Sequence, residues 1–183
     1  HATNCAGIIG SEGIANTNTL GVLQKIKINS YGFATTVNGT NYAKLNAAPG
    51  ANISNHSYGI NLGWAYRTSP TAGWYWVSDY DFSTTDTYSG SYGDQDIAFD
   101  QIVYSNPEQI VVKSSGNYYG DGPSGSFSGA FKQNSSGSYV PFLSTDVIPP
   151  NNCSLGYNCI GWGSLAKNII VAGAANQLTT LGN

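Results

Sequence analysis

Two apolar segments constrain the fold of this chain more than any other feature. Residues 109–117 (QIVVKSSGN) and 168–175 (NIIVAGAA) carry runs of apolar side chains that leave neither face polar. Strands of that kind are typical of parallel sheets that are covered on both sides. Residues 94–105 predict a helix, with Asp94 and Asp96 near the positive end of its dipole. Helix and strand therefore alternate, and the chain predicts an α/β fold with a parallel sheet.

The remaining elements are predicted from spacing and from turn residues. Residues 1–10 predict a helix, because Ala2, Cys5, Ala6 and Ile9 recur at helical spacing. The other predicted elements are strands at 25–31 and 51–59 and a short helix at 41–50. Two long segments without predicted secondary structure interrupt the pattern, an aromatic-rich insertion at 60–93 and a Gly/Ser/Pro-rich loop region at 118–166. Loops of that length usually serve a function.

Composition excludes several classes of protein. With 40% hydrophobic and only 9% charged residues, the chain of 183 residues is no candidate for disorder, and its length suits one domain. The net charge of −3 leaves no basic surface for nucleic acid. No apolar run reaches the ~20 residues that span a bilayer, so we expect neither a nucleic-acid nor a membrane partner. The low charge and the many Asn, Ser and Thr residues are typical of a secreted protein.

Several residues allow two interpretations each. The aromatic insertion either walls a cleft, with its tryptophans mostly buried, or forms a sugar-stacking platform with exposed rings; the residues concerned are Trp64, Trp74 and Trp76. Its acidic residues Asp79, Asp81 and Asp86 either bind structural calcium or form an ordinary acidic loop, which we favour. We expect no required cofactor and no metal site, and we interpret His56 as a strand histidine.

The cysteines indicate a local disulfide. Cys153 and Cys159 bracket a short loop rich in Asn and Gly, which predicts that they pair, with reduced thiols as the alternative. Cys5 lies in an apolar stretch and is expected to be a small buried side chain.

Four short motifs are spread along nearly the whole chain, and their order is informative. They are HATNCAG (1–7), Ser57-Tyr58-Gly59, Ser114-Ser115-Gly116-Asn117 and AKNIIVAGAA (166–175). In this order they resemble the histidine motif, the substrate-binding strand, the oxyanion motif and the Gly-Ala strand of the subtilisin-like serine proteases (subtilases, peptidase S8). The resemblance implies a three-layer fold, with helices on both faces of a parallel sheet.

The resemblance also implies roles for individual residues. His1 would be the general base that accepts the proton of a serine nucleophile, and Asn117 would donate a hydrogen bond to the oxyanion. The cleft that binds an extended peptide or protein substrate would be lined by Ser57, Tyr58, Gly59, Ser114, Ser115 and Gly116. The implied activity is that of a serine endopeptidase that works through an acyl-enzyme.

Two parts of the family pattern do not occur in the chain. No Asp-Ser-Gly or Asp-Thr-Gly strand precedes His1, and no Gly-Thr-Ser-Met-Ala motif follows. Residues 1–183 are therefore expected to be part of a catalytic domain, incomplete at both ends and inactive alone, with the rest supplied by missing sequence or another chain. The alternatives are a non-catalytic peptide- or glycan-binding module on the same scaffold and an inactive homologue that docks a partner.

Overall fold

The structure is a computed structural model of the chain, and it falls into two compact units, His1–Pro49 and Gly50–Asn183. Each unit is described by itself. The structure describes residues 1–31, 50, 52–60, 62–78, 84, 86, 88–123, 125, 127–156, 159–161 and 163–174.

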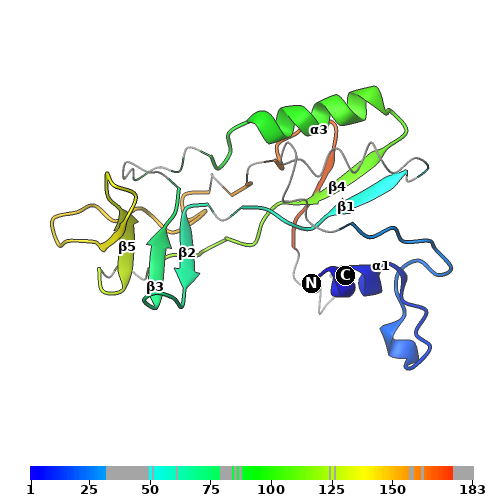
Figure 1. Cartoon of the computed structure of the whole chain (residues 1–183), viewed down its shortest axis with the longest axis horizontal. Coiled ribbons are helices and arrows are strands. Elements are labelled where there is room, and N and C mark those ends of the chain that lie inside the picture. Colours follow the sequence, from blue (N-terminus) through cyan, green and yellow to red (C-terminus); the bar gives the residue numbers. More distant parts are fainter. Residues whose placement is uncertain are drawn as a thin grey trace, which may run out of the picture. The chain divides into compact units, whose positions relative to one another are not determined.

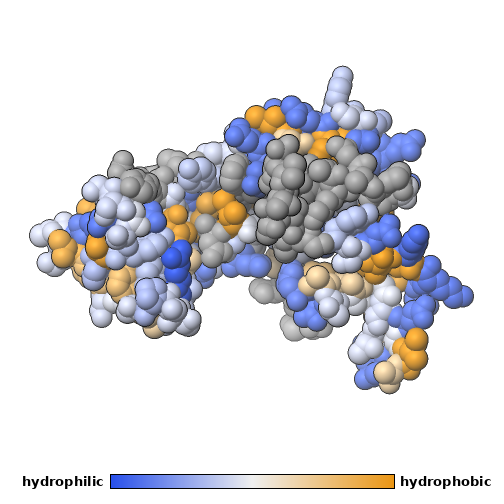
Figure 2. Space-filling model, in the orientation of Figure 1, coloured by the Kyte–Doolittle hydropathy of each residue, from blue (hydrophilic) through white to orange (hydrophobic). Residues whose placement is uncertain are grey.

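The first unit begins with the helix α1 (Ala2–Gly10), which confirms the helix predicted at the start of the chain. A 3-10 turn (Thr17–Thr19) follows, and Glu12 and Leu20 form an isolated antiparallel bridge. Large apolar side chains are exposed on this unit, among them Ile8, Ile14 and Val22, and Figure 2 shows orange, hydrophobic surface over it.

The prediction of a strand at 25–31 is wrong. These residues have no strand pairing, and Lys25 has a positive φ of 57°, a conformation in which an extended strand cannot continue. The chain just before them already bonds to the end of α1, since the N–H groups of Val22 and Leu23 donate to the carbonyls of Ile8 and Ile9. Without a partner strand, the alternating Ile residues do not form a strand. The short helix predicted at 41–50 lies outside the described residues, except for Gly50.

The second unit contains the predicted parallel sheet. Its strands are β1 (Ile53–His56), β4 (Ile110–Ser114) and β7 (Ile170–Ala172), in the spatial order β1-β4-β7. Both pairings are parallel, and β4 is the central strand. All three strands lie inside segments that the sequence predicts as extended. The prediction of an α/β fold with a parallel sheet is confirmed.

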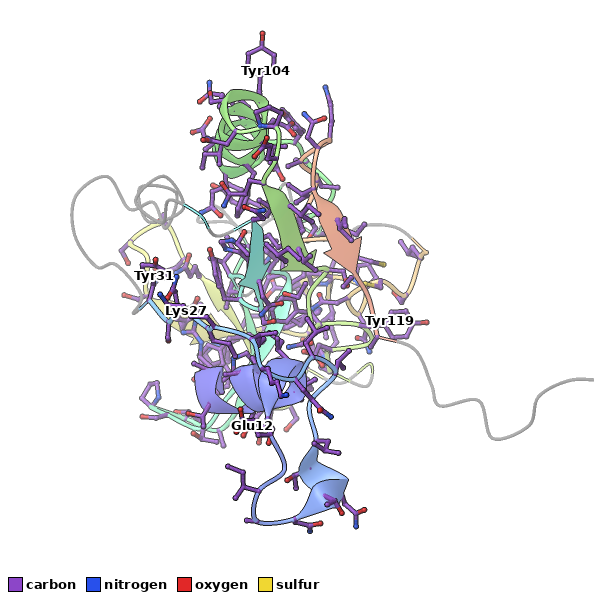
Figure 3. All side chains as sticks on the ribbon, turned by 90° about the vertical axis from the view of Figure 1, so that its right-hand side faces the viewer. Glu12, Lys27, Tyr31, Tyr104 and Tyr119 are labelled. Carbon is purple, nitrogen blue, oxygen red and sulfur yellow. The ribbon has the colours of Figure 1, made fainter. Side chains whose placement is uncertain are left out.

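The helix α3 (Asp94–Ser105) covers one face of this sheet, and its bounds equal the predicted ones (Figure 1). Its first turn is closed by the Asp96 carboxylate, which accepts a hydrogen bond of 2.9 Å from the N–H of Gly93. Phe99 and Ile102 are buried, and the Phe99 ring lies 5.2 Å from the His56 ring of β1. On the opposite side of the helix, Tyr104 projects into solvent in Figure 3. The helix is thus amphipathic in the structure, as its sequence predicts.

The prediction that 60–93 and 118–166 lack secondary structure is wrong, because together they form a second sheet. Its strands, in spatial order, are β2 (Trp64–Arg67), β3 (Gly73–Trp76), β5 (Ala130–Gln133) and β6 (Tyr139–Pro141). β2–β3 and β5–β6 are antiparallel pairs, and β3 joins β5 in parallel. The strands have three or four residues each, too few for a clear alternation pattern.

Aromatic side chains hold the second sheet together. Its core cluster contains Trp64, Trp76, Ala130 and Phe142, with Trp74 packed against it. The Trp64 and Trp76 rings meet edge to face at 5.4 Å between centroids. Ring pairs of this geometry contribute about 1 kcal/mol of stabilisation beyond that from the burial of their apolar surface. The second sheet therefore has a small core to which both long segments contribute, which explains why the polar, Gly-rich insertion contains so many rings.

Candidate active site

One cleft in the second unit contains every substrate-binding residue that the sequence predicts. It is lined by Ser57, Tyr58, Gly59, Ile60, Ser114, Ser115, Gly116, Asn117, Tyr118, Gly161 and Ser164. Two segments form its walls. One wall, Ser57–Gly59, follows directly after β1, and the other, Ser114–Asn117, begins at the last residue of β4. Because β1 and β4 are parallel neighbours, their carboxyl ends reach the same edge of the sheet. Ligands of open α/β sheets bind at such edges.

The wall formed by Ser114–Asn117 is held by hydrogen bonds on both sides. The Ser115 N–H donates to the carbonyl of Ala172 at 2.9 Å, and the Ser164 hydroxyl donates to the carbonyl of Ser114 at 2.9 Å. Gly116 has a φ of 126°, a backbone conformation that residues with a side chain adopt only under strain, so glycine is favoured there. These contacts fix the backbone up to Asn117, whose side chain is exposed to solvent.

The wall formed by Ser57–Gly59 is fixed by the side chains next to it. The Tyr58 hydroxyl lies 2.6 Å from Nδ1 of His56, and the carbonyl of Tyr58 accepts a hydrogen bond of 2.5 Å from Nζ of Lys113. Asn55 donates from Nδ2 to the Ser57 hydroxyl at 3.0 Å.

His56 occupies the strand position that the sequence analysis favours. It is the last residue of β1 and is buried, and its Nε2 has no hydrogen-bond partner among the described residues. Burial, together with the weaker effect of the positive charge of Lys113, lowers the pKa of His56 from 6.5 to about 4. The imidazole is therefore neutral at physiological pH.

His1 lies in the first unit. It is the residue before α1, its imidazole is exposed, and its ring nitrogens lie 3.9 and 4.0 Å from Sγ of Cys5. Cys5 is half-buried, not fully buried as the sequence predicts. Asn117 and the cleft belong to the second unit, so the pairing of His1 with them stays a prediction.

Four cleft residues were missed by the sequence analysis: Ile60, Tyr118, Gly161 and Ser164. Ile60 and Tyr118 directly follow predicted site motifs, so extending each motif by one residue would have found them. Gly161 and Ser164 come from a Gly-rich segment with no motif of its own. Tyr119 is exposed and points away from the fold in Figure 3.

The tryptophans of the insertion are mostly buried, which confirms that part of the prediction. Trp64 is 0% exposed and Trp76 is 3% exposed, while Trp74 is partly buried. Their surroundings are the second sheet, and Ile60 is the described residue of 60–93 that lines the cleft. Two buried rings cannot serve as a sugar platform, so the structure argues against that interpretation.

The described residues contain no cluster of His, Cys, Asp and Glu side chains that could hold a metal ion. Asp86 is buried and its carboxylate accepts hydrogen bonds from the N–H groups of Tyr88 and Ser89, so it closes a local turn. Asp79 and Asp81 lie outside the described residues.

Cys153 and Cys159 are not joined by a disulfide in the structure. Burial and, to a lesser extent, a hydrogen bond with Cys159 raise the pKa of Cys153 to about 12. The two side chains are thus neighbours, and their disulfide stays a prediction. Among the described helices, none combines the length and apolar character needed to cross a membrane.

Comparison with known proteins supports the assignment made from the motifs. The chain belongs to the subtilase family, whose model, peptidase S8, matches residues 1–181. Membership of this family supports a serine peptidase of the S8 type. Neither the curated proteins nor the solved structures gave a significant match.

Proposed function

We propose that the protein containing this chain is a secreted serine endopeptidase that cuts peptide bonds through an acyl-enzyme. Residues 1–183 form part of its catalytic domain. The proposal is supported above all by the cleft, which unites all six predicted substrate-binding residues with Asn117. Segments 57–59 and 114–116 come from different parts of the chain, and the motif order alone predicts that they meet.

In this proposal each wall of the cleft has a separate task. A peptide in extended conformation binds along the two walls, as a strand adds to a sheet edge. The scissile carbonyl then lies beside Asn117, whose amide donates a hydrogen bond as negative charge develops on the carbonyl oxygen. His1 takes the proton of the attacking serine hydroxyl and returns it to the leaving amine.

The exposure of the Asn117 side chain supports its assignment as oxyanion donor. A donor of this kind must meet an oxygen that is present only when substrate is bound, so its amide should be held in place without being consumed by the fold. The backbone before Asn117 is fixed by the Ser115 and Ser164 hydrogen bonds, whereas its own side chain is open to solvent.

Substitution of Asn117 in the complete protease tests the proposal. Asn117→Ala should lower kcat by about 10²-fold, within the range that loss of one oxyanion donor costs in subtilisin, and leave KM nearly unchanged. His1→Ala should abolish activity. Asn18→Ala, which removes an exposed amide of the first unit, serves as the control. An unaltered kcat in Asn117→Ala would remove Asn117 from the site.

A labelling experiment tests the expectation that this chain alone does not hydrolyse peptides. The 183 residues contain no Gly-Thr-Ser motif, so a fluorophosphonate probe should not label the isolated chain. Stoichiometric labelling of one serine would contradict this expectation. Tight peptide binding by the complete protein without any hydrolysis would favour the non-catalytic module instead.

A further inference from the structure

A lysine lies where the catalytic proposal does not require one. Lys113 is the fourth residue of β4, the central strand of the parallel sheet, and its side chain is 1% exposed. Lysine is rarely buried to this extent because its ammonium loses its hydration. A buried lysine beside a substrate cleft therefore calls for a reason in the contacts that it makes.

The contacts of Lys113 converge on one residue of the cleft wall. Its Nζ donates a hydrogen bond of 2.5 Å to the carbonyl of Tyr58, and it also lies 4.8 Å from the centroid of the Tyr58 ring. The pairing of β1 with β4 ends at His56 and Lys113, so the wall residues 57–59 lie beyond the ladder. The lysine thus bonds to the wall just where sheet pairing stops.

The same side chain also lies close to a third segment of the cleft, which contains Gly161 and Ser164. Gly163 packs so closely that a Cβ at this position would lie 3.3 Å from Cε of Lys113 and 2.8 Å from Oε1 of Gln95. Gly163 stands between the lining residues Gly161 and Ser164, and its φ of 81° also favours glycine. The Lys113 side chain therefore bonds to Tyr58 and lies next to the segment that contains Ser164.

The titratable groups around Lys113 come from β1, from the wall and from α3. They are His56 and Tyr58, which bond to each other, and Asp96. His56 is neutral, so it does not repel the ammonium, and Asp96 supplies a negative charge. Burial lowers the pKa of Lys113 from 10.5 to about 8, although Asp96 acts in the opposite direction. The ammonium form therefore predominates at neutral pH.

We propose that Lys113 is a positioning residue for substrate binding, whose ammonium holds the Tyr58 carbonyl and so fixes the wall 57–59 relative to 114–117. The role of Lys113 in substrate binding rests on the proposed function, whereas its hydrogen bond to the wall does not. When the ammonium loses its proton, the charge-assisted hydrogen bond weakens and the wall loosens. Binding of peptide should then weaken in alkaline solution.

The grip on the wall is tested without any catalysis. In the full chain, the ¹³C shift of the Tyr58 carbonyl and that of Cε of Lys113 should titrate together, with a midpoint near pH 8. The control is Lys132→Met, which removes the lysine that pairs with Asp146 at 2.6 Å in the second unit and should leave the titration of the Tyr58 carbonyl shift unchanged. A Tyr58 carbonyl that ignores the titration of Lys113 would overturn the proposal.

The link to substrate is tested by kinetics on the complete protease. Lys113→Met keeps the length of the side chain and removes the charge, and it should raise KM for a peptide by about tenfold with a smaller change in kcat. The wild-type KM should rise above about pH 8, and this rise should be absent in Lys113→Met. Lys132→Met should leave both KM and its pH profile unchanged.

The outcomes separate the two proposals. If Lys113→Met does not fold, the wild-type titration and the wild-type KM profile still decide the matter. The ¹³C shifts of Lys113 and the Tyr58 carbonyl could titrate together in a protein without peptidase activity. That result would refute the proposed function, while the role of Lys113 in fixing the wall would stand. A folded Lys113→Met protease with the KM and pH profile of the wild type would show that Lys113 has only a structural role.

Discussion

Acidification should destabilise the second unit through one side chain, His56. This imidazole is 6% exposed at the end of β1, next to Phe99 and Lys113, and its pKa is about 4 instead of 6.5. Between these two values the unfolded chain binds a proton that the folded chain excludes. The contribution of neutral His56 to the free energy of unfolding is therefore fully present above about pH 6.5, and it is lost as the pH falls toward 4.

The size of the effect follows from the two pKa values. From about pH 7.5 to about pH 5, this single group should lower the free energy of unfolding by about 2 kcal/mol. That loss corresponds to a change of about 30-fold in the unfolding equilibrium constant. The lowered pKa values of Asp100 and Asp146 place their titration below 3.8, which is outside this range.

The assay is urea unfolding, followed by tryptophan fluorescence at several pH values. His56→Gln retains a polar side chain but cannot titrate, so its free energy of unfolding should depend less on pH by the same 2 kcal/mol or so. The difference between the two proteins removes the contribution of all other groups. In addition, the His56 ring proton shifts of the wild type should stay constant down to about pH 5.

Equal pH dependence in the wild type and in a folded His56→Gln variant would refute this reasoning. A midpoint near 6.5 for the His56 ring would refute it as well, because it would mean that the imidazole is charged and solvated in the folded protein.

The remaining predictions concern the second unit. Asn152→Ala should lower the free energy of unfolding by about 1–3 kcal/mol in urea titrations, because the Asn152 amide bonds to the main chain of Leu62 and Trp64 at 2.9–3.3 Å. Asn18→Ala is the control, and an unchanged urea midpoint in Asn152→Ala would contradict this prediction. Non-reducing digestion and mass spectrometry should find one peptide that contains Cys153 and Cys159 and is two hydrogens lighter than its reduced form. Ready alkylation of both thiols in the native protein would reject that disulfide.

The elements of the parallel sheet could be predicted because their patterns are local. The helix α3 has acidic residues in its first turn and a clear apolar face, and its bounds agree with the prediction at both ends. The strands β4 and β7 are short apolar runs, which predict buried strands. Val111 and Lys113 of β4 are buried, but the prediction is wrong for β7, whose residues Ile170 and Ala172 are exposed. The resemblance to the subtilases implied that segments 57–59 and 114–116 line one cleft. The structure has both beside the same cleft, and their substrate-binding role stays a prediction.

The second sheet was missed because its pairing is not local. Its central contact joins Trp74 and Tyr75 of β3 to Ala130 and Phe131 of β5, which no window of neighbouring residues contains. The aromatic β2–β3 hairpin was the available signal, since Trp and Tyr favour strands. Lys113 was missed for another reason. A lysine in an apolar strand gives no indication in the sequence of which carbonyl it will meet.

The parallel pairing of β3 with β5 has a consequence for moving this sheet to another protein. The core cluster takes Trp64 and Trp76 from the first hairpin, and it takes Ala130 and Phe142 from β5 and the residue after β6. Either hairpin without the other would expose half of that cluster and leave a bare strand edge, which invites aggregation. Segments 60–93 and 118–166 therefore depend on each other for a covered core and a paired sheet edge. Transplanting the sheet to another protein would require both segments.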